Sequence, residues 1–299
     1  MSSSNLSLVP TPPGEPRSPI PAPLEKRLQA LDRAAERLRH PDADPEAIHD
    51  ARVATRRLTA ILDVGRAELA PGQRRRVRRQ LARARRRLGP YREREVSLGL
   101  LEKEMAAAPA ATAEALRKIV SRLVAHGEGD RTRAASVVSP ARVEKIADRL
   151  RRAVLRGTLV AWDTPEAMAP ASARVERRRA QAIEALDRAL AAPSDTAFHA
   201  ARVAAKKWRY GMEIVAELRE GEADPALSAL RDLQERLGAM QDRAVLARLL
   251  EREARRASKR ADVASLYALL ERAGSLRAEN LRAREPLASS LERLRAPSA

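Results

Sequence analysis

Two segments of the chain share one arrangement, in which a histidine is followed by cationic side chains at helical spacing. The members are His49, Arg52, Arg56 and Arg57 in the first segment, and His199, Arg202, Lys206 and Lys207 in the second, 150 residues later. Guanidinium and ammonium groups bind phosphate oxygens, while imidazole can donate a hydrogen bond to an anion or transfer a proton near neutral pH. These residue types predict an anion-binding site, with acid–base chemistry at the histidines as an alternative.

A second marker follows each of these segments. Leu88-Gly89 in the first half returns as Leu237-Gly238 in the second half, 149 residues later. Two markers with nearly the same offset indicate duplication of a unit about half the length of the chain. We therefore expect the two histidine segments to occupy equivalent places in two similar halves.

The repeated segment has the pattern of a helix with one basic face and one apolar face. At 100° per residue, Arg52 and Arg56 lie on the same side as His49, whereas Ala54 and Leu58 lie on the opposite side. The second copy places five polar residues in one stripe, namely His199, Arg202, Lys206, Arg209 and Tyr210. The apolar side of each helix is expected to pack into a bundle, which leaves the basic side for a ligand or for solvent.

Acidic residues are missing from both basic stripes. No Asp or Glu occurs between Arg52 and Arg57, or between Arg202 and Tyr210. A helix face exposed to solvent commonly mixes charges of both signs in i,i+4 pairs, and like charges one turn apart repel each other. A plain solvated face is the alternative for either copy alone, but repetition of the acid-free stripe favours a polyanion ligand.

A further basic segment belongs to the first half alone. Residues 74–87 contain nine arginines in fourteen positions, and no acid occurs between Glu68 and Glu93. We include four of these arginines in the expected binding site: Arg78, Arg79, Arg85 and Arg86. Arginine has a planar fork of donors that suits phosphate oxygens. The alternative is an unusually basic helix that faces solvent.

Composition restricts the classes of function. The 299 residues carry a net charge of +18, which predicts polyanionic partners. Cysteine is absent, which excludes disulfides and thiolate metal sites. We expect no cofactor and no metal site, because a zinc ion needs about three protein ligands and neither His40 nor His126 has a partner at the repeat offset. No apolar run is long enough to span a membrane and no secretory signal is visible, so the cytoplasm is the expected compartment.

The elements that position these residues are predicted to be helices throughout. Ala, Leu, Arg and Glu dominate, and aromatic residues make up only 2% of the chain. We expect helices in the first half at 24–38, 45–69, 73–88, 91–106, 110–125 and 140–158. In the second half we expect them at 165–191, 195–219, 225–238, 240–258, 260–272 and 275–295.

These helices predict an all-α fold of duplicated helical bundles, related by a pseudo-two-fold axis and sharing a basic surface or channel. Residues 1–23 contain seven prolines and five serines and are expected to form a disordered tail. The expected helical repeats cover residues 24–160 and 165–295.

With these residues in view, the chain resembles the CHAD family, the conserved-histidine α-helical domain, over roughly residues 24–295. The resemblance rests on the segments that begin at His49 and His199, and above all on Lys206-Lys207-Trp208-Arg209-Tyr210 followed by Leu237-Gly238-Ala239-Met240-Gln241-Asp242. It implies two pseudosymmetric helical bundles around a basic surface, binding of inorganic polyphosphate and association with polyphosphate granules. One departure is Glu93, where the family commonly has an aspartate.

The leading hypothesis is a protein that binds inorganic polyphosphate without catalysis. The chain offers dense cations and few aromatic residues, whereas proteins that bind single-stranded nucleic acid commonly stack bases on aromatic side chains. A nucleic-acid or nucleoid-binding protein is the main alternative, because charge alone would favour it. A phosphotransfer or metal enzyme is less favoured, because such sites hold their metal through carboxylates that the basic stripes lack.

Overall fold

The computed structural model describes residues 22–39, 45–64, 71–125, 138–155, 165–219 and 225–295, and every regular element in these ranges is an α helix. The all-α prediction is therefore confirmed. The expected tail lies outside the described residues apart from its last two positions. No helix in the described ranges combines the length and the apolar character needed to cross a membrane.

The helices of the first half follow one another closely along the chain. They are α1 (Ala22–Arg37), α2 (Pro45–Val64), α3 (Pro71–Arg87), α4 (Gly89–Ala107), α5 (Ala110–Ala125) and α7 (Pro140–Leu155). The second half contains α8 (Pro165–Ala191), α9 (Asp195–Arg219), α10 (Pro225–Lys259), α11 (Val263–Arg282) and α12 (Glu285–Arg295). Proline at the first position of α2, α8 and α10 is favourable because the first amide of a helix has no partner within the helix.

Two expected helix breaks are absent from the structure. The predicted end at 238 lies at a glycine and the predicted end at 272 lies two residues before one, but α10 continues through Gly238 and α11 continues through Gly274. Glycine within a helix costs about 1 kcal/mol relative to alanine. Burial of neighbouring apolar residues, such as Leu237 and Met240 in α10 and Leu276 in α11, outweighs that cost.

Three groups of buried residues form the core. The first joins α1, α2, α3 and α7 and includes Leu31, Leu58 and Leu81. The second joins α8, α9, α12 and the first part of α10 around Trp208. The third joins α4, α5, α11 and the second part of α10 around Leu116. The interior is thus built almost wholly from aliphatic side chains, as the scarcity of aromatic residues requires.

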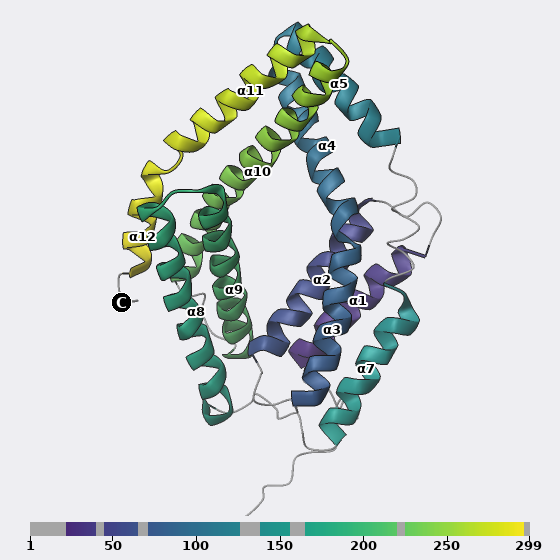
Figure 1. Cartoon of the computed structure of the whole chain (residues 1–299). Coiled ribbons are helices and arrows are strands. Elements are labelled where there is room, and N and C mark those ends of the chain that lie inside the picture. Colours follow the sequence, from purple (N-terminus) through teal and green to yellow (C-terminus); the bar gives the residue numbers. More distant parts are fainter. Residues whose placement is uncertain are drawn as a thin grey trace, which may run out of the picture.

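The helices form two groups that meet at both ends of the molecule. Figure 1 shows α1, α2, α3 and α7 on one side and α8, α9 and α12 on the other, while α4, α5, α10 and α11 converge at one end. At the opposite end α2 packs against α9 and α8. The two histidine helices, α2 and α9, therefore lie next to each other although they are distant in the sequence.

Candidate anion-binding site

The apolar faces of α2 and α9 hold these helices in their bundles. Ala51, Leu58 and Ile61 of α2 are buried, and so are Ala201 and Trp208 of α9. The helical period then turns the histidine and cation positions away from each core. The expected division of each helix into an apolar and a basic face is present in the structure.

The basic faces of α2 and α9 approach each other at Arg56 and Lys206. Burial and the positive charges of Arg202, Arg56 and Arg209 together lower the pKa of Lys206 to about 8, whereas Asp242 opposes this shift. Arg56 belongs to the first half of the chain and Lys206 to the second. Positive charges from both halves therefore act on Lys206.

Further arginines extend this field on the side of the first half. Burial lowers the pKa of Arg52, as do the charges of Arg56, Arg92 and Arg85. Nη1 of Arg52 donates a hydrogen bond to the backbone oxygen of Arg85 at 3.3 Å, which fixes α3 next to α2. We name six of the cations in these interactions the basic cluster: Arg52, Arg56, Arg85, Arg92, Arg202 and Lys206.

Two buried nitrogen atoms of the cluster have no hydrogen-bond acceptor among the described residues. They are Nε of Arg56 and Nε of Arg202, one from each half. A buried N–H group without a partner is unfavourable, and an anion that reached it would supply the missing acceptor. The cluster therefore combines concentrated positive charge with donors that remain to be satisfied.

Carboxylates next to the cluster have equivalent positions in the two halves. Asp242 of α10 interacts with Arg202, and Glu93 of α4 interacts with Arg52. Burial raises the pKa of Asp242, although the cations around it act in the opposite direction. The longer side chain of Glu93 thus interacts with Arg52 as Asp242 interacts with Arg202. Glutamate at position 93 therefore takes the place of the aspartate that the family commonly has there.

The two histidines lie at the edge of the cluster in different surroundings. Burial lowers the pKa of His49, and the charges of Arg92 and Arg56 lower it further. His199 is exposed, and its Nδ1 lies 3.0 Å from Oε1 of Gln241. Residues 92 and 241 are equivalent at the 149-residue offset, so each histidine interacts with the equivalent position of its own half, Arg92 in α4 or Gln241 in α10.

Several of the predicted residues lie outside the cluster. Arg57 is exposed and, with Tyr210, lines a groove of about 430 Å³ that also holds Glu213 and Glu217. The ring of Tyr210 lies 5.1 Å from Cζ of Arg209, whose Nε is 3.7 Å from Glu213. The pair Arg57 and Tyr210 therefore lies in a separate groove, where cations and carboxylates occur together.

Lys207 is also turned away from the cluster. Its side chain is exposed and lines a hollow of about 390 Å³ with His199, Gln181 and Arg178. Arg178 donates through Nη1 to the backbone oxygen of Lys207 at 3.3 Å. This hollow is basic, but in the described structure it borders α8 and not α2.

The arginine-rich helix α3 divides its cations between two sides. Arg85 belongs to the basic cluster, whereas Arg78 forms an ion pair with Asp63 at 3.0 Å. Arg79 and Arg86 are exposed. Sequence reasoning assigned all four to one site; of these, Arg85 has a pKa that the charge of Arg56 helps to lower.

Sequence reasoning missed two residues that contribute to the site. Arg92 and Asp242 follow the repeated Leu-Gly marker by four and five positions, and closeness to that marker was the available signal. Arg178, which lines the hollow with Lys207, lies in a helix that carries no repeated phrase, and nothing in the sequence distinguished it from other arginines. In the described ranges no group of three or more His, Cys, Asp or Glu side chains is placed to hold a metal ion.

Comparison with known proteins gives a family and a fold. The CHAD domain pattern matches residues 22–251. The crystal structure of the CHAD domain from the plant Ricinus communis is similar, with a TM-score of 0.67, 22% identity, and coverage of 93% of this chain and 92% of that chain. PptA from Streptomyces chartreusis has a TM-score of 0.61, 22% identity, and coverage of 90% and 96% respectively. No curated protein matches the sequence.

Proposed function

This chain belongs to the CHAD domain family, and from that premise we propose that it binds inorganic polyphosphate through the basic cluster. Polyphosphate carries about one negative charge per phosphate and has no bases. A protein that binds it needs closely spaced cations and no surface on which bases would stack. The cluster has this character, because its six members are all arginine or lysine.

The convergence of Arg56 and Lys206 is the observation that carries this proposal. Each residue is partly buried near other cations, which is unfavourable while no anion is present. A phosphate chain between them would neutralise both charges and would supply acceptors for the buried Nε atoms of Arg56 and Arg202. One chain would thereby be held by both halves of the protein.

We propose that binding is not coupled to catalysis. Phosphoryl-transfer enzymes commonly place carboxylate-bound divalent metal ions against the phosphate. The nearby carboxylates, Asp242 and Glu93, each interact with an arginine, Arg202 and Arg52 respectively. In this proposal the protein is cytoplasmic, and binding recruits it to polyphosphate granules.

Competition between two polyanions tests the choice of ligand. Fluorescently labelled long-chain polyphosphate is bound to the protein and displaced by unlabelled polyphosphate or by duplex DNA, at matched phosphate concentration and salt. We expect polyphosphate to displace the label at a concentration at least about tenfold lower than DNA. Equal displacement by DNA would support the nucleic-acid alternative instead.

A second assay tests the absence of catalysis. The protein is incubated with long-chain polyphosphate and Mg²⁺, and released orthophosphate is measured. We expect no release above that of the triple variant Arg56→Ala, Arg202→Ala, Lys206→Ala. Release that depends on these residues would show that the protein is an enzyme.

A further inference from the structure

A second basic site is present on the far side of α3. A cavity of about 980 Å³ lies between α3 and α7, and its volume falls within the range of sites for small molecules. Residues 83 and 87 of α3 are about 200° around the helix from Arg85 at 100° per residue. The arginine-rich helix therefore directs different cations to the cavity and to the basic cluster.

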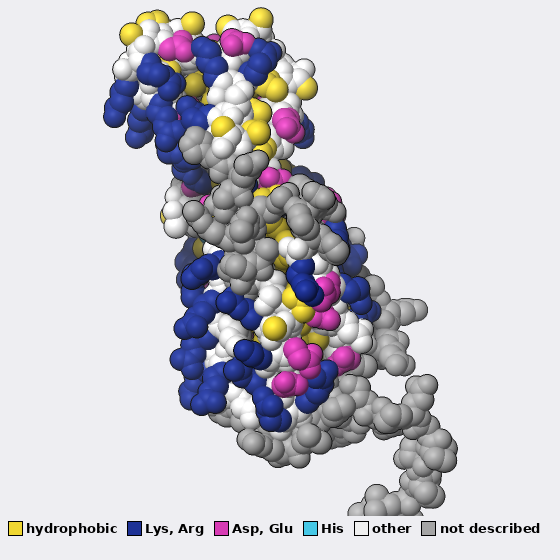
Figure 2. Space-filling model, turned by 90° about the vertical axis from the view of Figure 1, so that its right-hand side faces the viewer, with side chains coloured by type: hydrophobic (Ala, Val, Ile, Leu, Met, Phe, Trp, Pro, Cys, Tyr) yellow, Lys and Arg dark blue, Asp and Glu magenta, His cyan; other side chains and the backbone are white. Residues whose placement is uncertain are grey.

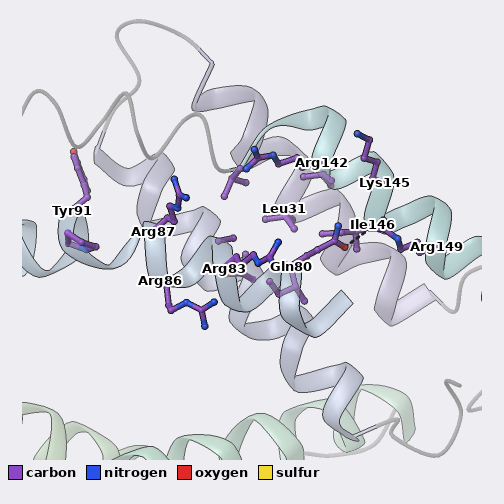
Figure 3. Close-up of a pocket in the computed structure, with 16 residues that line it drawn as sticks. Leu31, Gln80, Arg83, Arg86, Arg87, Tyr91, Arg142, Lys145, Ile146 and Arg149 are labelled. Atoms are coloured by element: carbon purple, nitrogen blue, oxygen red, sulfur yellow. Dashed lines mark hydrogen bonds between the residues drawn. The ribbon is translucent and has the colours of Figure 1, made fainter. Parts of the chain in front are cut away.

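The cations of this cavity come from two facing helices. Arg83 and Arg87 of α3 are one turn apart, and Arg142, Lys145 and Arg149 of α7 follow at intervals of three and four residues. Figure 3 shows the two sets on opposite sides of the cavity; Arg86 also lines the cavity, but its side chain projects away from α7. None of the described residues that line the cavity is acidic.

The floor of the cavity is apolar and buried. Leu31, Leu81 and Ile146 line it and are buried in the first core. Nη1 of Arg149 donates a hydrogen bond to Oε1 of Gln80 at 2.7 Å, which links α7 to α3 at the cavity. A low-dielectric floor strengthens the attraction between the surrounding cations and an anion held among them.

Lys and Arg side chains are concentrated in one region of the surface on this side of the molecule. In Figure 2, which faces the side that carries α7, Lys and Arg side chains gather along one margin of the lower part, and the carboxylates lie apart from them. Glu144 and Asp148 of α7 are engaged by Arg151 on another side of that helix. These carboxylates therefore lie on a different side of α7 from residues 142, 145 and 149.

We propose that the cavity between α3 and α7 is a second anion site, which takes a compact oligophosphate with three or more negative charges. Cations on two walls that converge on one small volume suit a short, highly charged ligand. The triphosphate group can come from inorganic tripolyphosphate or from a nucleoside triphosphate. This site is separate from the basic cluster, and its existence does not depend on polyphosphate binding there.

Calorimetric titration with tripolyphosphate tests the site in a protein whose basic cluster is removed by Arg56→Ala, Arg202→Ala and Lys206→Ala. One added pair of changes, Arg142→Ala and Lys145→Ala, removes cations from the α7 wall and leaves the bond between Arg149 and Gln80 intact. A second pair, Arg83→Ala and Arg87→Ala, removes cations from the α3 wall. The control pair, Arg252→Ala and Arg255→Ala, removes two exposed charges from the distant part of α10.

We expect each wall pair to weaken tripolyphosphate binding by about tenfold or more, and the control pair to change it by less than about threefold. The two wall pairs lie on different helices, so if one variant misfolds, the other variant still tests the site. The helicity of both variants is checked by circular dichroism. Binding that survives both wall pairs, or that falls equally with the control pair, overturns the proposal.

Parallel titration with ATP identifies the source of the ligand. If ATP binds with similar affinity and the wall pairs weaken its binding equally, the site also takes nucleoside triphosphates. Binding of tripolyphosphate alone restricts it to inorganic oligophosphates, and binding of neither overturns the proposal. Long-chain polyphosphate titrated into the wall variants with an intact basic cluster tests the proposed function separately.

Discussion

At the scale of residues, the site depends on cations held where they repel one another. Lys206 is the clearest case, because burial and the charges of Arg202, Arg56 and Arg209 lower its pKa to about 8. The motif residues could be predicted from sequence because they recur at helical spacing. For neighbouring residues such as Arg56 and Arg57, the sequence could not predict which one lies in the basic cluster. Packing of α2 against α9 decides this.

Polyphosphate binding should weaken as the pH rises through 8. Above that pH Lys206 loses its proton in the unbound protein, and a bound polyanion must restore it, so binding is coupled to proton uptake. Affinity for long-chain polyphosphate is measured at pH 7 and pH 9, where its internal phosphates remain fully charged. The affinity of the Lys206→Arg variant should change much less between these two pH values than that of the parent protein. An equal change in affinity would show that another group titrates.

His49 should take up a proton when a polyanion binds below pH 7. Burial and the charges of Arg92 and Arg56 lower the pKa of His49 in the unbound protein, and the negative charge of the ligand reverses the effect of those neighbours. Calorimetry at pH 6 in two buffers of different ionisation enthalpy measures this uptake. The His49→Gln variant should take up fewer protons; unchanged uptake would contradict a role for His49 at the ligand.

At the scale of elements, proline and glycine account for most of the differences between prediction and structure. In the first half α3 ends at Arg87 and α4 begins at Gly89, with Pro90 in its first turn. In the second half Ala239 stands at the equivalent place and α10 continues without interruption. The expected helix ends at 238 and 272 are absent, because buried apolar residues maintain the helix on both sides of Gly238 and Gly274.

Gly274→Ala should therefore stabilise the protein. Gly274 lies within α11, an added Cβ would meet no atom within 4 Å, and alanine in a helix is favoured by about 0.5–1 kcal/mol. The free energy of unfolding is measured by urea denaturation at an unchanged m-value. Gly211→Ala is the contrasting change, because the added Cβ would lie 3.0 Å from Val175 of α8. The gain in stability should be lost in this variant.

At the scale of the whole molecule, three cores of aliphatic residues support one basic cluster. The all-α fold followed from composition and periodicity, because helices without β-branched runs leave few other folds. The cluster and the carboxylate beside it depend on five helices, since α3 supplies Arg85, α4 supplies Arg92 and α10 supplies Asp242, while α2 and α9 supply the motif residues. Contacts between elements so distant in sequence are decided by tertiary packing and are not encoded in local patterns.

Binding of long-chain polyphosphate should fall steeply with salt. By analogy with DNA, each neutralised phosphate contributes about 0.9 to the slope of log affinity against log salt concentration. About six contacts, one for each cation of the cluster, would lower affinity by about a thousandfold between 50 and 200 mM salt. Titrations at several salt concentrations give the slope, and a slope near that of one or two contacts would be incompatible with a ligand held by both halves.

The most direct test compares two triple variants that lose the same net charge. One removes the contact between the halves, through Arg56→Ala, Arg202→Ala and Lys206→Ala; the other removes exposed cations from the far part of α10, through Arg252→Ala, Arg255→Ala and Lys259→Ala. Affinity for long-chain polyphosphate is measured for both at one salt concentration. We predict that the first variant loses affinity by about a hundredfold or more, because charge-assisted contacts contribute about 1.5–3 kcal/mol each, while the second changes only a few-fold. Equal losses in the two folded variants would contradict a dedicated site between the halves.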